Sequence, residues 1–264
     1  MPRFAANLDW LFYELPFIER FAAAAAAGFN GVEFLFPYDY PINELQSLLT
    51  RHKLKNVLFN LPAGDWAAGE RGIASLPGRE AEFRESVERA IPYAIALQTP
   101  RLHVLAGIVL ADQDREEHRR VYIENLRYAA NRFQPYGITL LVEAINSFDM
   151  PGYFIRTQAE SFDTCTTVNS DNIKMQLDLY HMQMTEGNLA TGLRRYQSSY
   201  DHVQIAGVPG RNEPDTGEVN YPYLFGVMDE IGYEGWVGCE YRPRKGTVEG
   251  LGWYADTLSN IRTL

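Results

Sequence analysis

The chain has 264 residues, of which 46% are hydrophobic and 22% charged, and its formal net charge is −10. This composition supplies one large core and excludes a disordered chain, and the negative charge disfavours nucleic acid and anionic membranes as partners. No apolar run could span a bilayer, no signal-peptide pattern opens the sequence, and two cysteines are too few for a disulfide framework. We therefore expect a cytoplasmic protein.

Short apolar runs alternate along the chain with longer amphipathic segments. The runs cover residues 4–8, 31–36, 56–61, 102–107, 138–145, 173–180, 202–207 and 236–241. The segments between them place apolar residues at three- and four-residue spacing, which predicts helices. Strict alternation predicts parallel strands with right-handed crossovers. Eight such units predict one α/β domain over residues 1–264, a (β/α)8 TIM barrel.

The longest predicted connection between a strand and a helix covers residues 62–80. It contains four glycines and a tryptophan. After the third strand of a barrel it would lie on the catalytic face, and loops of this length are usually functional or disordered. A moving lid and a fixed surface loop are both open interpretations of this segment.

Four oxygen-bearing side chains lie near the ends of four consecutive predicted strands: Glu143, Asp178, Gln204 and Glu240. Because the active sites of such barrels are built at the carboxyl ends of the strands, the four should converge. Three carboxylates this close repel one another unless a cation neutralises them or some are protonated. One acidic strand end is more often a loop cap, but the recurrence predicts a metal site, and oxygen ligands favour Mg²⁺ or Mn²⁺ over zinc.

Two further residues are candidates for binding a substrate. His181, in QLDLYH, follows Asp178 by three positions, and we expect it on a loop of the catalytic face with a hydrogen bond to a substrate oxygen. Arg211, in GVPGRNEP after the seventh predicted strand, offers the planar fork that suits a carboxylate. The alternatives are a structural histidine and an exposed loop arginine.

The other histidines are expected to be structural. His52 and His118 fall in charged helical segments and should be solvated. His103, inside the fourth predicted strand, should be a hydrogen-bonded barrel residue. His202 begins the seventh strand and should lie at the bottom of the barrel, far from the site.

Six segments resemble the hydroxypyruvate isomerase family among the xylose-isomerase-like barrels: VEFLFPYDYP, NLPAGDWAAGERGIASLPGRE, VEAINSFDMPGYF, QLDLYHMQMTEGNL, HVQIAGVPGRNEPDTGEVNYPYLF and GWVGCEYRP. The likeness covers nearly the whole chain. It implies isomerisation of hydroxypyruvate and 2-hydroxy-3-oxopropanoate (tartronate semialdehyde), with Glu143 and Glu240 as the paired proton donor and acceptor. The related ketose 3-epimerases bind a metal through glutamate, aspartate, histidine and glutamate, and Gln204 stands at the histidine position.

These groups suit metal-assisted proton transfer through an enediolate, because a cation stabilises the negative charge that develops on the substrate oxygens. The 2-oxo-tetronate isomerases share most of the motifs, so a four-carbon acid stays open beside the three-carbon one. A metal-dependent phosphodiesterase of the barrel endonuclease type is disfavoured by five scattered histidines and the net charge. A silent sugar-acid binding protein and a homo-oligomer also stay open.

Overall fold

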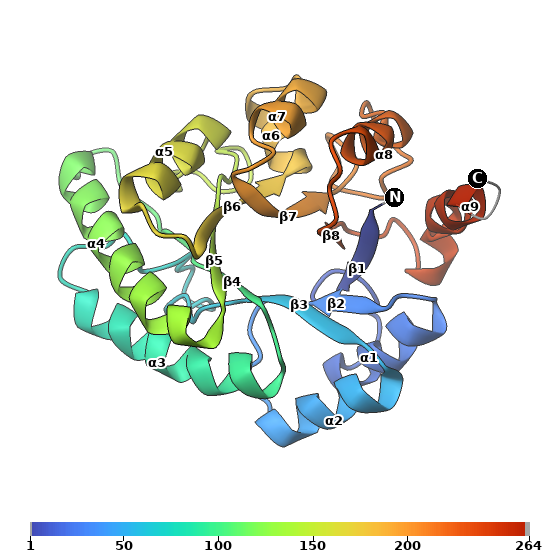
Figure 1. Ribbon diagram of the computed structural model, residues 1–264, viewed down its shortest axis with the longest axis horizontal. Coiled ribbons are helices and arrows are strands. Elements are labelled where there is room, and N and C mark those ends of the chain that lie inside the picture. The colour runs from blue at the N-terminus through green and yellow to red at the C-terminus, as the bar shows by residue number, and fades with distance from the viewer. Residues whose placement is uncertain (1, 262–264) are drawn as a thin grey trace.

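The fold is a closed barrel of eight parallel strands, described by a computed structural model over residues 2–261 (Figure 1). Each strand pairs with its neighbours in chain order, and the last pairs with the first. The strands are β1 (Arg3–Asn7), β2 (Gly31–Glu33), β3 (Lys55–Asn60), β4 (Arg101–His103), β5 (Thr139–Glu143), β6 (Ile173–Asp178), β7 (Tyr200–Ile205) and β8 (Trp236–Cys239). The predicted TIM barrel is confirmed.

Helices surround the barrel and connect successive strands (Figure 1). They are α1 (Phe17–Ala26), α2 (Ile42–His52), α3 (Glu80–Ala96), α4 (Arg115–Phe133), α5 (Gln158–Val168), α6 (Leu179–Thr185), α7 (Leu189–Arg195), α8 (Tyr221–Glu230) and α9 (Gly252–Ile261), with 3-10 turns η1 (Gln134–Tyr136) and η2 (Val248–Gly250). Within residues 2–261, no helix combines the length and the apolarity that crossing a membrane requires.

The barrel interior is built in layers, because alternate residues of each strand point inward. Ala5, Val57 and Leu141 come from β1, β3 and β5 and form a small apolar cluster with Trp236. Polar side chains fill other interior positions, nearer the carboxyl ends of the strands. The polar site therefore rests on a packed apolar floor.

Five of the eight strands, β2, β4, β5, β6 and β8, are shorter than the apolar runs that predicted them. β4 ends at His103 instead of residue 107, and β2 ends at Glu33 instead of residue 36. After β4 the chain leaves the barrel, and Ala106 forms an antiparallel bridge with Gly72 of the long loop. Apolar residues thus continue past the strand ends because they pack beneath loops.

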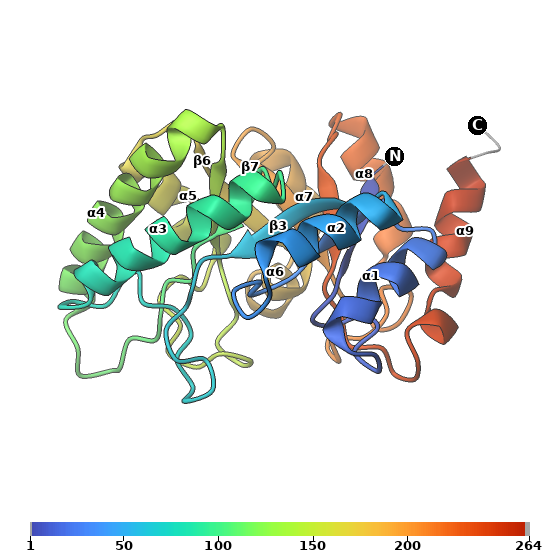
Figure 2. The same cartoon turned by 90° about the horizontal axis from the view of Figure 1, so that it is seen from below.

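The long connections after β3, β4 and β5 extend from the same end of the barrel, at the lower edge of Figure 2. The loop over residues 62–80 is tied to the β4 loop at Gly72, whose φ is +111° and whose added Cβ would lie 2.3 Å from the carbonyl oxygen of Leu105. An ion pair between Arg79 and Glu70 closes it on itself. Only glycine fits at position 72.

Candidate active site

The strand-end side chains predicted to converge do meet at the carboxyl end of the barrel. Glu143 and Asp178 are the last residues of β5 and β6, Gln204 is the last but one of β7, and Glu240 follows β8. All four are buried. Glu143, Gln204 and Glu240 line a cavity of about 110 Å³, and Asp178 lies beside it. Pockets for drug-sized ligands measure roughly 300–1,000 Å³, so this cavity suits a much smaller molecule.

Asp178 serves the fold with one oxygen and the site with the other. Its Oδ1 accepts hydrogen bonds from the backbone N–H groups of Tyr180 (2.7 Å) and His181 (3.3 Å), so Asp178 caps helix α6. Its Oδ2 lies 3.7 Å from Nε2 of His181 and 3.7 Å from Nη2 of Arg211. The spacing in QLDLYH therefore reflects both a helix cap and a site.

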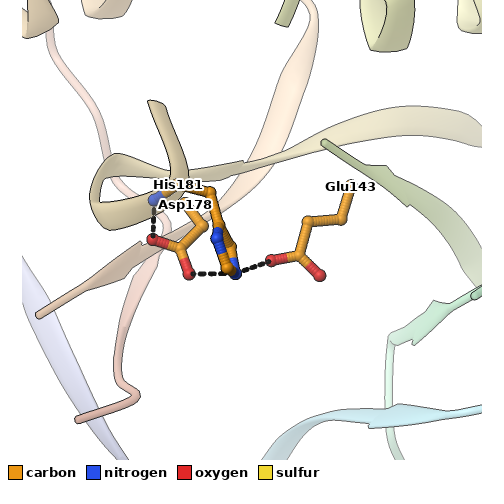
Figure 3. A group of neighbouring side chains, drawn as sticks. All are labelled: Glu143, Asp178 and His181. Atoms are coloured by element: carbon orange, nitrogen blue, oxygen red, sulfur yellow. Dashed lines mark hydrogen bonds and ion pairs between the residues drawn. The ribbon is translucent and has the colours of Figure 1, made fainter. Parts of the chain in front are cut away.

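His181 lies between two carboxylates, as Figure 3 shows. Its Nε2 is 3.9 Å from Oε1 of Glu143, and ligand atoms of Glu143, Asp178 and His181 lie within 4.8 Å of one another, so the group could hold a metal ion. Burial, then the charge of Arg211, lowers the pKa of His181 well below its usual value, so the ring is neutral. The prediction that His181 lies on a loop was wrong, because the Asp178 cap starts helix α6 at position 179.

Glu143 carries the least satisfied carboxylate of the site. Its Oε1 has no hydrogen-bond partner, and its Oε2 lies 3.4 Å from Nε2 of His103, which is also without one. Burial, then the charges of Glu240 and Asp178, raises the pKa of Glu143 well above its usual value. An unpaired buried acceptor is costly. A ligand in the cavity could supply the missing partner.

His103 differs from its prediction in one respect. It lies inside the barrel as expected, but its Nε2 has no hydrogen-bond partner and faces Glu143. Burial, then the charge of His202, lowers the pKa of His103 to about 3. A neutral ring therefore stands beside Glu143 and does not stabilise its ionised form.

Arg211 lines the cavity and faces the carboxylates. Its Nη2 is 3.3 Å from Oε2 of Glu240, and its guanidinium stacks on the rings of Trp10 (4.4 Å) and Tyr180 (4.9 Å). Burial raises the pKa of Glu240 to about 8 against the opposing effect of Arg211. Arg211 has a φ of +53°, a backbone conformation that costs a non-glycine residue about 1–3 kcal/mol. The surrounding structure holds a strained residue at the site.

Gln204 has both ends of its amide engaged below the cavity. Its Nε2 donates to Oε1 of Glu33 (2.8 Å), and its Oε1 accepts from Nε2 of Gln176 (2.6 Å). The carboxylate of Glu33 fixes this orientation, because it can only accept. One lone pair of the Gln204 oxygen is left for a further partner.

Sequence reasoning missed Glu33, the last residue of β2. Its carboxylate also accepts from Asn7 Nδ2 (3.0 Å) and pairs with His202 Nε2 (2.7 Å). The signal was present, because GVEF, LVEA and GCEY each carry a glutamate near the end of a strand. Gly238 makes room for this carboxylate, since an added Cβ would lie 2.4 Å from its oxygens.

Two predictions about the histidines outside the candidate site, His202 and His118, were also wrong. His202 is not far from the site, because it precedes Gln204 by two residues on the same strand face and shares Glu33 with it. His118 is not solvated but buried on α4, with its ring centroid 6.3 Å from that of Phe154. The loop after β5 covers this turn of α4, which charge spacing alone could not indicate. His52 is partly buried.

A family model described as a xylose isomerase-like TIM barrel matches residues 21–257. The chain belongs to this family. The 2-oxo-tetronate isomerase of Cupriavidus necator strain H16 is 54% identical over 98% of this chain and 99% of its own, and the hydroxypyruvate isomerase of Escherichia coli K12 is 49% identical over 96% and 98%. The resemblance to hydroxypyruvate isomerases is thereby confirmed.

A solved structure also matches closely. It is described as an AP endonuclease, family 2, from Brucella melitensis, and it superposes with a TM-score of 0.95 at 53% identity, covering 97% of this chain and 99% of that one. The Brucella structure and the relatives with isomerase names are about equally similar in sequence to this chain. The chemistry must therefore be argued from the site.

Proposed function

We propose that this protein is an isomerase that interconverts hydroxypyruvate and 2-hydroxy-3-oxopropanoate. One observation carries the proposal: the unpartnered carboxylate of Glu143 and the carboxylate of Glu240 line one small cavity that Arg211 also enters. Aldose–ketose isomerisation by proton transfer needs a base at one carbon and a proton donor at the adjacent carbon, and a cation can bind the carboxylate of an acid substrate. The identity to the hydroxypyruvate isomerase of Escherichia coli supports this assignment.

The side chains also fit a divalent metal. Oε1 of Glu143 has no hydrogen-bond partner, Oδ2 of Asp178 takes no part in the helix cap, and Oε2 of Glu240 lies 3.3 Å from Nη2 of Arg211. We propose Glu143, Asp178, Gln204 and Glu240 as the residues that would hold Mg²⁺ or Mn²⁺. When bound, the metal would stabilise negative charge as it develops on the substrate oxygens.

The reaction moves two protons and leaves the atom count unchanged. One glutamate of the pair Glu143 and Glu240 removes the proton from the hydroxyl-bearing carbon, and a carboxyl group returns a proton to the former carbonyl carbon. The hydroxyl proton passes to the neighbouring oxygen, and His181 lies close enough to assist. Arg211 binds the substrate carboxylate, and its stacking on Trp10 and Tyr180 holds its plane fixed.

A second candidate substrate is a 2-oxo-tetronate. Its support is the identity to three relatives with that name, at 54%, 48% and 44%. An endonuclease activity has less support, despite the description of the Brucella structure. Among the described residues the possible metal group contains two carboxylates and one histidine, not a histidine-rich set, and the net charge of −10 would repel DNA.

The proposal is tested by assaying hydroxypyruvate and a 2-oxo-tetronate side by side, each with and without exhaustive chelation. We expect turnover of at least one acid, a loss of at least tenfold on chelation, and recovery with Mg²⁺ or Mn²⁺. Full activity in demonstrably metal-free protein would exclude the metal role. Failure on both acids, with cleavage of DNA at abasic sites, would exclude the isomerase.

Two further proposals concern the setting of the protein. Cys165 and Cys239 are unpaired, which supports a reducing, cytoplasmic location. A homo-oligomer stays a prediction, and light scattering of the purified protein would test it.

A further inference from the structure

Asn146 stands three residues after Glu143, and its side-chain amide has a defined orientation. Its Oδ1 accepts hydrogen bonds from the backbone N–H groups of Phe148 (3.0 Å) and Asp149 (2.9 Å). A backbone N–H can only donate, so the oxygen must lie on this side of the amide. The amide nitrogen is therefore the atom that faces the site.

That nitrogen points at the ring of His181. Nδ2 of Asn146 lies 2.7 Å from Nδ1 of His181, and the backbone N–H of Asn146 donates to the same ring atom at 3.4 Å. Both donors need a lone pair on Nδ1. An imidazole ring carries a proton on at least one of its nitrogens, so a ring that accepts hydrogen bonds at Nδ1 carries its proton on Nε2.

We propose that Asn146 is a positioning residue that fixes His181 as the Nε2–H tautomer, so that His181 donates a hydrogen bond to a substrate oxygen and does not ligate the metal. This inference rests on the proposed function for the identity of the acceptor. Metal ligation through Nε2 requires a lone pair on that atom, which this tautomer lacks. Of the group of three that could hold an ion, the carboxylates of Glu143 and Asp178 remain as ligands.

The surroundings of Nε2 agree with a donor that awaits a ligand. The nearest carboxylate oxygens lie 3.7 Å away on Asp178 and 3.9 Å away on Glu143, which is beyond hydrogen-bond length. His181 is buried and lines the cavity. The Nε2–H group of His181 thus lies near two acceptors but forms a hydrogen bond with neither.

The turn after β5 does not by itself explain asparagine at position 146. Aspartate would accept the same two backbone N–H groups with one oxygen. It would however place a second oxygen against Nδ1 of His181, where only a donor fits the Nε2–H tautomer. Asn146→Asp therefore keeps the turn but requires Nδ1 of His181 to donate a hydrogen bond instead of accepting one.

The first test is the protonation state of the His181 ring, measured by ¹⁵N NMR on histidine-labelled protein with Mg²⁺ present and assigned with His181→Gln. We expect a protonated Nε2 and a bare Nδ1 in the wild type, and the reverse in Asn146→Asp. In the wild type, Oδ2 of Asp149 accepts a hydrogen bond from Nδ2 of Asn146 (3.2 Å), so Asn146→Asp places two carboxylates side by side. The double variant Asn146→Asp, Asp149→Asn removes that repulsion and should show the same reversal. Asn131→Asp, exposed on α4, controls for one added charge and should keep the wild-type tautomer.

The second test separates positioning from folding. Asn146→Asp should lower kcat at least tenfold while KM changes less than about threefold, and Asn146→Ala should lose less, because the backbone N–H still faces Nδ1. Affinity for Mn²⁺, measured by calorimetry, should change less than about threefold in His181→Gln.

A wild-type ring with its proton on Nδ1 would overturn the proposal, as would a tenfold loss of Mn²⁺ affinity in His181→Gln. The NMR result does not depend on turnover. Inactivity toward both acids with the expected tautomer would therefore count against the proposed function alone.

Discussion

Two buried glutamates near the barrel axis, Glu33 and Glu143, have opposite surroundings. Three side chains, Asn7, His202 and Gln204, bind the carboxylate of Glu33 at 2.7–3.0 Å. Glu143 has one oxygen without a partner and like charges nearby. Burial alone does not identify a functional carboxylate. An unsatisfied hydrogen-bonding capacity does, because a substrate or an ion can complete it.

The largest expected effect comes from replacing the carboxylates of Glu143 and Glu240, which line the cavity. Glu143→Gln and Glu240→Gln each keep an oxygen but remove the basic carboxylate, so each should lower turnover roughly 10²–10⁴-fold. Substrate affinity should change only a few-fold. Steady-state kinetics with hydroxypyruvate measures both, and near-normal turnover by either variant would remove that residue from the mechanism.

The first of these variants, Glu143→Gln, also tests the comparison with Glu33 in a stability assay. Glu143→Gln should leave the metal-free protein as stable as the wild type or more stable, because burial beside Glu240 and Asp178 disfavours the ionised form of Glu143 and the amide carries no charge. Urea unfolding of metal-free samples would show this. A marked loss of stability would place Glu143 with Glu33 as a structural carboxylate.

Removal of the Arg211 guanidinium should come next in size. Arg211→Ala should cost about 2–4 kcal/mol in binding an acid substrate, which raises KM well over tenfold. A neutral hydroxyketone should be affected less than about threefold. Arg211→Lys should recover part of the loss, since it keeps the charge without the fork. Equal losses for both substrates would show that Arg211 supports the loop instead.

Substitution of Glu33, whose carboxylate is fully hydrogen-bonded, should lower the stability of the fold. Glu33→Gln replaces an acceptor-only group with one that also donates, so a buried donor of Asn7, His202 or Gln204 loses its acceptor. We expect the free energy of unfolding to fall by about 1–3 kcal/mol. Denaturant unfolding at neutral pH measures the change, and an unaltered midpoint would contradict the structural role.

The smallest effect is expected from a partly buried ion pair away from the site. A hydrogen bond from Arg79 lowers the pKa of Glu70 on the long loop. The ion pair therefore stabilises the fold at pH values above the pKa that Glu70 has in the unfolded chain. This stabilisation is lost as the pH falls through the pKa of Glu70 in the folded protein. Glu70→Gln should cost at most about 1 kcal/mol at neutral pH, because both side chains are partly solvated. In unfolding curves the difference from wild type should vanish in acid. A difference that grows in acid would contradict the sign.

The barrel and the strand-end acids could be predicted from the sequence because both depend on local patterns. Eight apolar runs alternate with amphipathic segments, and Glu143, Asp178 and Glu240 stand near the ends of three of these runs. The surroundings of each acid could not be predicted. Whether Glu33 or Glu143 is satisfied depends on partners from other strands, such as Asn7 and His202. His118 was misread for the same reason, since a distant loop buries it.

The central claim is that Glu143 and Glu240 transfer protons to and from the carbon atoms of the substrate. Turnover of hydroxypyruvate in D₂O, followed by NMR, tests it most directly in the wild type, Glu143→Gln and Glu240→Gln. We expect deuterium on the reacting carbon of wild-type product, and at least 10²-fold slower incorporation in both variants. Full conversion with no deuterium uptake at carbon would indicate direct hydrogen migration and would contradict the account.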